Sequence, residues 1–311
     1  MALSTEPLSP ITQEHTDVYN RDGVVCLRNV INQEWVDLLD PVARKMLIDK
    51  QDFGLLPSLP GRYMARCIPE FRKLVFESGI AQACGQVLES KEIRFFFDEI
   101  FAKPAQSDAK TIWHADRMGW PVEGMMVPSL WVPITPITKK NSLEVIAGSH
   151  TEDKKYWLFS ANARKMIKPD DRDTHPDCEP LRGDGKTEFL TWDMNPGDML
   201  IVHPRALHYS SGNPTDDWRI ALSMRVFGDD IRWQPRPDCV NIAGVSWDEM
   251  LEGEKPAGSH FPLLWSEHGD ADDDSSYPRG FATSWSAQPM RKINEYDLFK
   301  KLSEEAHKAS S

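Results

Sequence analysis

The middle of the chain is built from short segments rich in β-branched, aromatic and other large apolar residues, which favour β-strands. Turns rich in Pro, Gly and Asn separate these segments, which cover residues 93–97, 129–137, 143–146, 198–203 and 219–227. In the last segment one face carries only apolar side chains, and the opposite face carries Arg219, Ala221, Ser223 and Arg225. Short strands spaced in this way predict a mainly β fold, an antiparallel sandwich or barrel, over about residues 91–230.

The first ninety residues have a different, mainly helical character. Asn32 is placed to cap a helix with apolar residues at spacings of three and four, although Pro41 should kink or split it. Pro69 fits the first turn of a second helix. Between the turn at Gly23 and these helices, residues 24–27 predict a short buried strand. We expect this region to support the β-rich core within one domain, residues 1–311.

Two further segments interrupt or extend the core. Residues 151–192 form a long polar insertion, which we expect to begin with a short helix capped by Thr151. Long loops inside a domain are often lids, but a simple surface excursion is an equal alternative here. Residues 231–311 form a C-terminal extension, in which residues 293–306 predict a terminal helix.

Composition narrows the class of function. A net charge of −12 argues against a nucleic-acid partner, because a phosphate-binding surface needs clustered Lys and Arg. The five cysteines are widely spaced and odd in number, which favours reduced thiols over a disulfide framework. The sequence begins without a secretion signal and contains no apolar run of about 20 residues. We therefore expect a cytoplasmic protein without a membrane partner that acts on a small molecule, as a monomer or a homodimer.

A metal site is indicated by His114 and Asp116. Residues two apart in an extended chain project to the same side, so this imidazole and this carboxylate can converge on one ion. A distant second His would complete a 2-His-1-carboxylate triad, which leaves open positions on iron(II). His203 and His208 both lie near the end of the predicted strand at 198–203, and either meets this requirement.

Arg219 stands on the polar face of the following strand. An arginine inside a barrel is unfavourable unless it binds an anion, and its fork of donors matches a carboxylate such as the distal end of 2-oxoglutarate. Pairing with a structural Asp or Glu is the equal alternative from the sequence alone.

A series of motifs, in a specific order and spacing over about residues 15–230, resembles the phytanoyl-CoA dioxygenase family of iron(II)/2-oxoglutarate oxygenases. The matching pieces are Tyr19-x-x-Asp22-Gly23-Val24-Val25, Lys103-Pro104, Trp113-His114-Ala115-Asp116, Leu130-Trp131-Val132-Pro133-Ile134, Asn141-Ser142-Leu143-Glu144-Val145-Ile146-Ala147-Gly148-Ser149-His150 and Gly197-Asp198 through His208-x-Ser210 to Arg219. The resemblance implies a double-stranded β-helix (jelly-roll, cupin-like) core with N-terminal and flanking α-helices.

The resemblance also implies a set of functional residues. Iron(II) would be held by His114, Asp116 and His208, because the family uses the second of its two histidines here. The co-substrates would be 2-oxoglutarate and O₂, with the distal carboxylate of 2-oxoglutarate on Arg219, the hydroxyl of Ser210 beside it and Trp131 close by. Retention of the carboxylate ligand disfavours halogenation. Ala115 and Tyr209 depart from the commonest family pattern, so the founding member's substrate is not carried over.

The implied activity is oxidation of a C–H bond, most simply hydroxylation, in a small or medium-sized metabolite, with conversion of 2-oxoglutarate and O₂ to succinate and CO₂. Oxidative desaturation or rearrangement by the same centre, a non-catalytic cupin-like binding protein and a zinc hydrolase are the alternatives. Side chains that flank the motifs are candidate substrate contacts: Phe97, Trp113, Trp120, Tyr209 and Arg225. Among these, Arg225 is the candidate for an anionic substrate group.

Overall fold

A computed structural model describes residues 2–56, 61–157, 171–236, 239–240, 242–245 and 250–281. Residues 158–170 of the insertion and the terminal helix expected at 293–306 lie outside the described residues.

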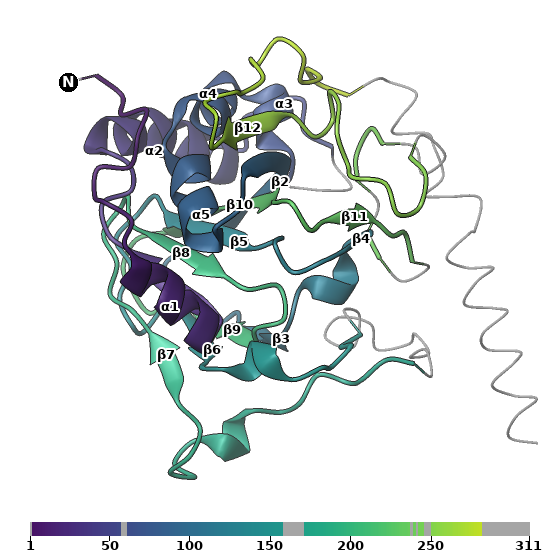
Figure 1. Cartoon of the computed structure of the whole chain (residues 1–311). Helices are drawn as coiled ribbons and strands as arrows, with labels where there is room; N and C mark the ends of the chain where they lie inside the picture. The colour runs from purple at the N-terminus through teal and green to yellow at the C-terminus, as the bar shows by residue number, and fades with distance from the viewer. Residues whose placement is uncertain are drawn as a thin grey trace, which may run out of the picture.

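Two antiparallel sheets face each other and form the core of the fold (Figure 1). The larger sheet has the order β1-β8-β5-β10-β2-β12, with bounds Val24–Leu27, Met199–Val202, Ser129–Pro133, Arg219–Phe227, Glu92–Lys103 and Leu263–Ser266. The smaller sheet has the order β3-β9-β6-β7, with bounds Thr111–His114, His208–Ser210, Leu143–Ile146 and Phe189–Thr191. This arrangement confirms the expected mainly β, double-stranded β-helix fold.

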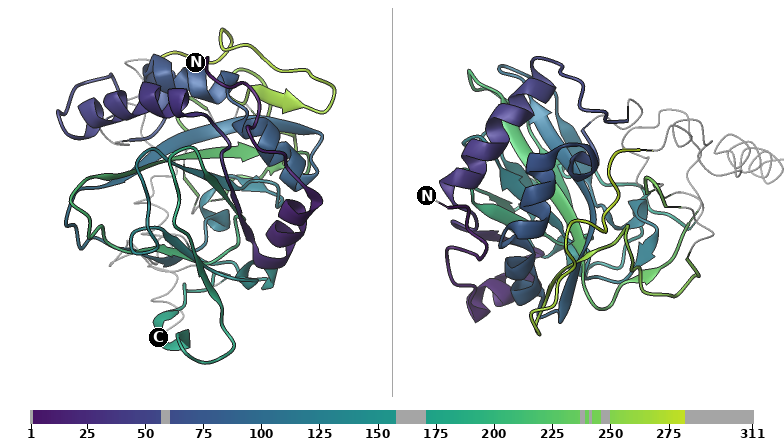
Figure 2. Two further views of the ribbon diagram at one scale, coloured as in Figure 1. Left: turned by 90° about the vertical axis from the view of Figure 1, so that its left-hand side faces the viewer. Right: turned by 90° about the horizontal axis from the view of Figure 1, so that it is seen from above.

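Helices from the first ninety residues cover the outer face of the larger sheet (Figures 1 and 2). They are α1 (Gln13–Asp22), α2 (Gln33–Leu47), α3 (Met64–Cys67), α4 (Pro69–Glu77) and α5 (Ile80–Leu88). Their apolar faces share one buried cluster with the apolar face of β10, namely Ile220, Leu222, Met224 and Val226. The opposite face of β10, with its two arginines, is thereby turned towards the smaller sheet.

The structure corrects two local expectations about helices: Pro41 does not split its helix, and no helix begins at Thr151. α2 is a single helix from Gln33 to Leu47 with Asn32 at its N-cap, and Pro41 lies inside it without dividing it. The burial of Trp35, Leu39 and Val42 on one face stabilises the helix across the missing hydrogen bond. Thr151 is the last residue of a 3-10 turn, η2 (Ser149–Thr151), and the chain after it runs without a helix to residue 157.

The chain after β10 closes one edge of the larger sheet. β12 pairs with β2 at that edge, and β11 (Arg232–Trp233) pairs with β4 (Val122–Glu123) in a separate ribbon. A second apolar cluster joins this ribbon to the end of β2 through the rings of Phe96, Phe227, Trp233 and Phe261. The longest helix of the described part is α2, with 15 residues, and none there has the length and apolar character to cross a bilayer.

Candidate metal centre and diacid pocket

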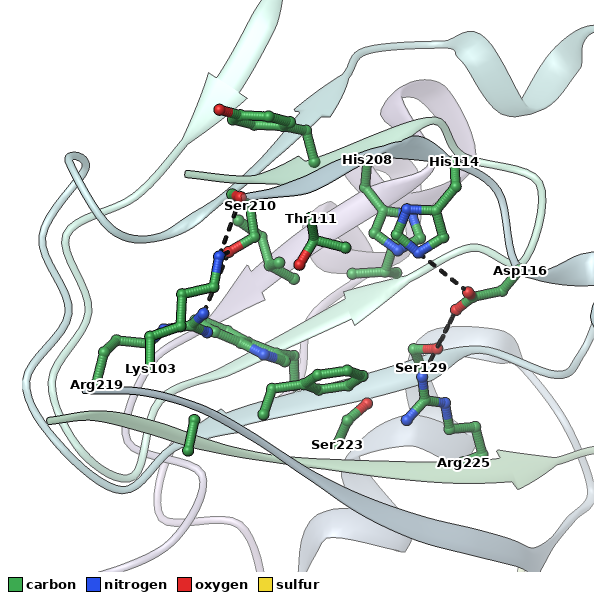
Figure 3. Close-up of a pocket in the computed structure, with 16 residues that line it drawn as sticks. Lys103, Thr111, His114, Asp116, Ser129, His208, Ser210, Arg219, Ser223 and Arg225 are labelled. Atoms are coloured by element: carbon green, nitrogen blue, oxygen red, sulfur yellow. Dashed lines mark hydrogen bonds and ion pairs between the residues drawn. The ribbon is translucent and has the colours of Figure 1, made fainter. Parts of the chain in front are cut away.

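A pocket lies between the two sheets, and its lining comes from both of them (Figure 3). β3 and β9 of the smaller sheet contribute one wall, and β2, β5 and β10 of the larger sheet contribute the other. The lining residues are Phe101, Ala102, Lys103, Thr111, His114, Asp116, Ser129, Trp131, Leu143, Val202, His208, Tyr209, Ser210, Arg219, Ser223 and Arg225.

Two histidines and one aspartate meet at one end of this pocket. The antiparallel register places His114 of β3 directly opposite His208 of β9, and the two ring centroids lie 4.1 Å apart. Asp116 follows β3 at the start of the 3-10 turn η1 (Arg117–Gly119), with its Oδ1 3.6 Å from His114 Nε2. One potential ligand atom from each of the three lies within 4.8 Å of the others. A single metal ion fits this spacing.

His203 occupies a different place. It follows β8, and its backbone N–H donates to the carbonyl of Gly23 at 2.8 Å. Its ring packs against His150, at a centroid distance of 4.8 Å, and against Tyr19 at 5.8 Å. The structure therefore brings His208, and not His203, to His114 and Asp116.

Backbone carbonyls select the tautomer of both histidines. Nδ1 of His114 lies 2.8 Å from the carbonyl oxygen of Ile112, and Nδ1 of His208 lies 3.0 Å from that of Ala206. Since a carbonyl only accepts, each Nδ1 carries the proton and donates it. Both Nε2 atoms keep their lone pairs for a metal, and the hydrogen bonds fix the ring orientations.

Burial and charge act in opposite directions on these groups. Burial alone would raise the pKa of Asp116, but His208, Arg225, His114 and a hydrogen bond from Ser129 together lower that pKa to about 2. Burial, reinforced by the charge of His114, lowers the pKa of His208 to about 4. At neutral pH this leaves an ionised carboxylate and a neutral imidazole, which are the protonation states that metal binding requires.

The opposite end of the pocket is cationic. Lys103 of β2 and Arg219 of β10 are direct cross-strand partners, and both side chains are buried. Burial and then the charge of Arg219 lower the pKa of Lys103 to about 8, and burial lowers the pKa of Arg219 to about 10. No carboxylate among the described residues forms an ion pair with either group.

The donors at this end are incompletely used. Arg219 Nη2 donates to Ser210 Oγ at 3.2 Å, whereas its Nε and Nη1 are buried without a hydrogen-bond partner. Lys103 Nζ donates to the carbonyls of Ser210 and Ser211 and to Ser210 Oγ, so its three donors have acceptors. Arg219 also stacks over Trp131, with 5.6 Å between its Cζ and the ring centroid. The spare donors match the oxygens of a bound carboxylate.

The five candidate substrate contacts divide into two groups. Tyr209 and Arg225 line the pocket, whereas Phe97, Trp113 and Trp120 are buried outside its lining. Trp113 stacks on Tyr209 at 5.3 Å and belongs to an apolar cluster with Ile146 and Leu207. Its position is a consequence of strand alternation, since the residue before His114 must point to the other side of β3.

The structure adds pocket residues that the sequence did not single out. Lys103 was noted only as part of a motif, and Thr111, Ser129 and Phe101 were not considered as site residues. Thr111 lies between the two ends of the pocket (Figure 3). Ser129 was missed because its contact with Asp116 joins β5 to the turn after β3, which are not adjacent in the sequence. The alternation of β2 was the available signal for Phe101, which shares a face with Lys103.

The insertion also reaches the metal motif. His175 Nε2 accepts a hydrogen bond from the backbone N–H of Ala115 at 3.1 Å, and its ring stacks on Tyr156. Arg182 pairs with Glu144 of β6 and with Glu179. The described part of the insertion thus contacts the metal motif at Ala115 and strand β6 at Glu144.

Comparisons with known proteins agree with this arrangement. The model of the phytanoyl-CoA dioxygenase (PhyH) family matches residues 19–221. A curated relative, phytanoyl-CoA dioxygenase 1 of Oryza sativa subsp. japonica, is 27% identical over 159 residues, which are 51% of this chain and 53% of that protein. The chain spans about half the length of this curated relative.

Solved structures share the fold at low identity. The non-heme alpha ketoglutarate dependent epimerase SnoN from nogalamycin biosynthesis is 20% identical, with a TM-score of 0.63 over 81% of this chain and 95% of SnoN. The carbocyclase SnoK from the same biosynthesis is 18% identical, with a TM-score of 0.62 over 83% and 99%. EctD from S. alaskensis, solved with 2-oxoglutarate and 5-hydroxyectoine, is 17% identical, with a TM-score of 0.57 over 82% and 93%.

Proposed function

The chain belongs to the phytanoyl-CoA dioxygenase family, and from this premise we propose that it is an iron(II)- and 2-oxoglutarate-dependent oxygenase. It would oxidise a C–H bond of a small or medium-sized metabolite while 2-oxoglutarate and O₂ become succinate and CO₂. The observation that carries the proposal is that one pocket contains both a group of three potential metal ligands and a buried arginine with no carboxylate partner.

The residues at the first end fit iron(II). His114 and His208 would bind through Nε2, and Asp116 through Oδ1, the carboxylate oxygen that lies nearer to His114. Two neutral imidazoles and one carboxylate form the donor set of the facial triad, which leaves coordination positions for co-substrates. When bound, the metal would supply the redox chemistry of O₂ activation.

The residues at the second end fit a diacid. The unpaired Nε and Nη1 of Arg219 would bind the distal carboxylate of 2-oxoglutarate, with Ser210 and Lys103 beside it. The keto acid end would then extend past Thr111 towards the metal cluster (Figure 3). A buried arginine without a carboxylate partner is destabilising until an anion binds, so the site should favour an anionic ligand over a neutral one.

The protein's own residues position and shield the reaction. Trp131 and Phe101 give the pocket apolar walls that exclude water from the co-substrate. Tyr209 lies on the lining and can contact the substrate next to the metal. Hydroxylation is the simplest outcome, but the same centre supports desaturation or rearrangement. Product analysis should therefore not be limited to addition of one oxygen atom.

The test is succinate release. Purified protein should convert 2-oxoglutarate to succinate only with iron(II) and O₂, and a metabolite screen should find compounds that stimulate the rate. His208→Ala should abolish turnover, whereas His203→Asn, five residues away and outside the cluster, is the matched control that should retain it. Metal binding without succinate release under any substrate would favour a non-catalytic binding protein. Turnover that needs zinc and no 2-oxoglutarate would favour a hydrolase.

A further inference from the structure

Arg225 lies on the same face of β10 as Arg219, six residues further along, and also lines the pocket. Its guanidinium is enclosed by aromatic rings, with its Cζ 5.3 Å from the ring centroid of Phe97, 5.4 Å from that of Phe101 and 6.0 Å from that of Trp120. The residue is only 5% exposed. Flat rings on several sides hold the planar group in one orientation.

The charge environment of Arg225 is the opposite of that of Arg219. Its Nη1 lies 3.4 Å from Oε2 of Glu99, and its Nη2 lies 3.9 Å from Oδ2 of Asp116. These contacts are ion pairs and not hydrogen bonds, and Nε and Nη1 of Arg225, like those of Arg219, have no hydrogen-bond partner. Glu99 is itself held by Arg62, whose Nε donates to Oε1 at 2.8 Å. Positively and negatively charged side chains therefore alternate in the order Arg62, Glu99, Arg225 and Asp116. Arg225 is neutralised by the chain's own carboxylates, and Arg219 is not.

The two oxygens of Asp116 have different neighbours (Figure 3). Oδ2 accepts a hydrogen bond from Ser129 Oγ at 2.9 Å and faces Arg225, whereas Oδ1 faces His114 Nε2. Ser129 and Arg225 are direct cross-strand partners in the register of β5 and β10. The larger sheet thus presents a paired hydroxyl and guanidinium to one oxygen and leaves the other for the metal.

We infer that Arg225 is a positioning residue that acts through Asp116, fixing the orientation of this ligand together with Ser129, and is not the anchor of an anionic substrate group. The inference rests on the proposed metal centre and assigns a role within it. An anionic substrate group at Arg225 would approach the carboxylates of Glu99 and Asp116, which would repel it. An anion has no such obstacle at Arg219.

The experiment measures metal affinity, which does not depend on turnover. Apo protein would be titrated with Co(II) under anaerobic conditions by calorimetry, and the visible spectrum of bound Co(II) would report ligand geometry. The variants are Arg225→Met, Arg225→Lys and Ser129→Ala. Arg94→Met is the matched control, because it removes an arginine–carboxylate pair, with Glu92, from the same sheet outside the pocket lining.

Loss of a residue that orients a metal ligand typically lowers metal affinity by about 10- to 100-fold. We expect a loss of this size and an altered Co(II) spectrum for Arg225→Met, and a smaller loss for Arg225→Lys and Ser129→Ala. Arg94→Met should bind Co(II) as the wild type does. Circular dichroism would identify a misfolded Arg225→Met, in which case Arg225→Lys and Ser129→Ala carry the test.

Two outcomes would overturn the inference. Unchanged Co(II) affinity and spectrum, with a higher KM for substrate, would assign Arg225 to substrate binding. Tighter Co(II) binding in Arg225→Met would mean that repulsion between the guanidinium and the metal outweighs its orienting effect. Failure of the proposed function is distinguishable, since it would appear as wild-type protein that binds metal but does not turn over 2-oxoglutarate.

Discussion

Replacement of Arg219 by Met should weaken 2-oxoglutarate binding and stabilise the ligand-free protein at the same time. The arginine is 2% exposed and uses one side-chain hydrogen bond, to Ser210, while Nε and Nη1 have no partner. In the complex these donors would form charge-assisted bonds to a carboxylate. In the free protein these donors belong to a buried, positively charged arginine that lies beside its cross-strand partner, Lys103. The two states therefore respond to the substitution with opposite signs.

The magnitudes follow from the contacts. Two charge-assisted hydrogen bonds, partly offset by the cost of desolvation, contribute about 3–4 kcal/mol, so the Kd for 2-oxoglutarate should rise roughly 10²- to 10³-fold. Removal of an uncompensated buried charge should raise the free energy of unfolding of the apo protein by about 1–3 kcal/mol. Arg219→Lys keeps the charge but loses the fork, so its loss of affinity should be intermediate.

The assay is calorimetric titration of 2-oxoglutarate into the Mn(II) form without O₂, combined with thermal unfolding of the apo protein. Arg94→Met serves again as the control and should leave the Kd unchanged. A Kd for Arg219→Met within about threefold of the wild-type value would refute the diacid site. A lower unfolding temperature for the apo variant would refute the argument that this arginine is unneutralised before ligand binds.

Three further predictions concern pH, the insertion and the entry to β1. Burial raises the pKa of Asp98 from 3.8 to about 7, so the folded state holds a proton that the unfolded chain releases between these values. Stability should fall with rising pH in this window, by up to about 4 kcal/mol, and urea titrations of Asp98→Asn should lack the fall. His175→Ala, which removes the acceptor of the Ala115 N–H, should lower Co(II) affinity about tenfold, and His175→Gln should restore it. Gly23→Ala should cost about 1–3 kcal/mol in urea unfolding, because φ is +76° and a Cβ would lie 2.5 Å from His150 Nδ1; an unchanged midpoint would contradict this.

The β-rich segments, the apolar face of β10 and the positions of helix starts were sufficient to predict much of the fold. The face of β10 that packs on the helices could be read from its apolar positions, and Asn32 and Pro69 stand where helices begin. Local rules failed where packing outweighed them. Pro41 is tolerated within α2 because the buried face of that helix contributes more than the lost hydrogen bond.

The candidate site could be predicted where residues are close in sequence or follow a family motif. His114 and Asp116 belong to this class, and so does Arg219, eleven residues after His208. His175 does not, and Lys103, although it lies in a family motif, was not predicted as a site residue. Lys103 reaches the cationic end through the register of β2 with β10, and His175 reaches the metal motif from an insertion. Neither relation has a signal in a single sequence, because both depend on which segments lie side by side.

The two arginines of β10 show this limit most clearly. Alternation places Arg219 and Arg225 on one face, and nothing local distinguishes them. Their surroundings do: Arg219 faces another cation, Lys103, across the sheet, whereas Arg225 lies opposite Ser129 and near two carboxylates. The first arrangement leaves a positive charge that a diacid can neutralise, and the second is already neutral. If both arginines bound ligand anions, substitution of either would weaken anion binding alone; we expect only Arg219 to do so, and Arg225 to act on the metal.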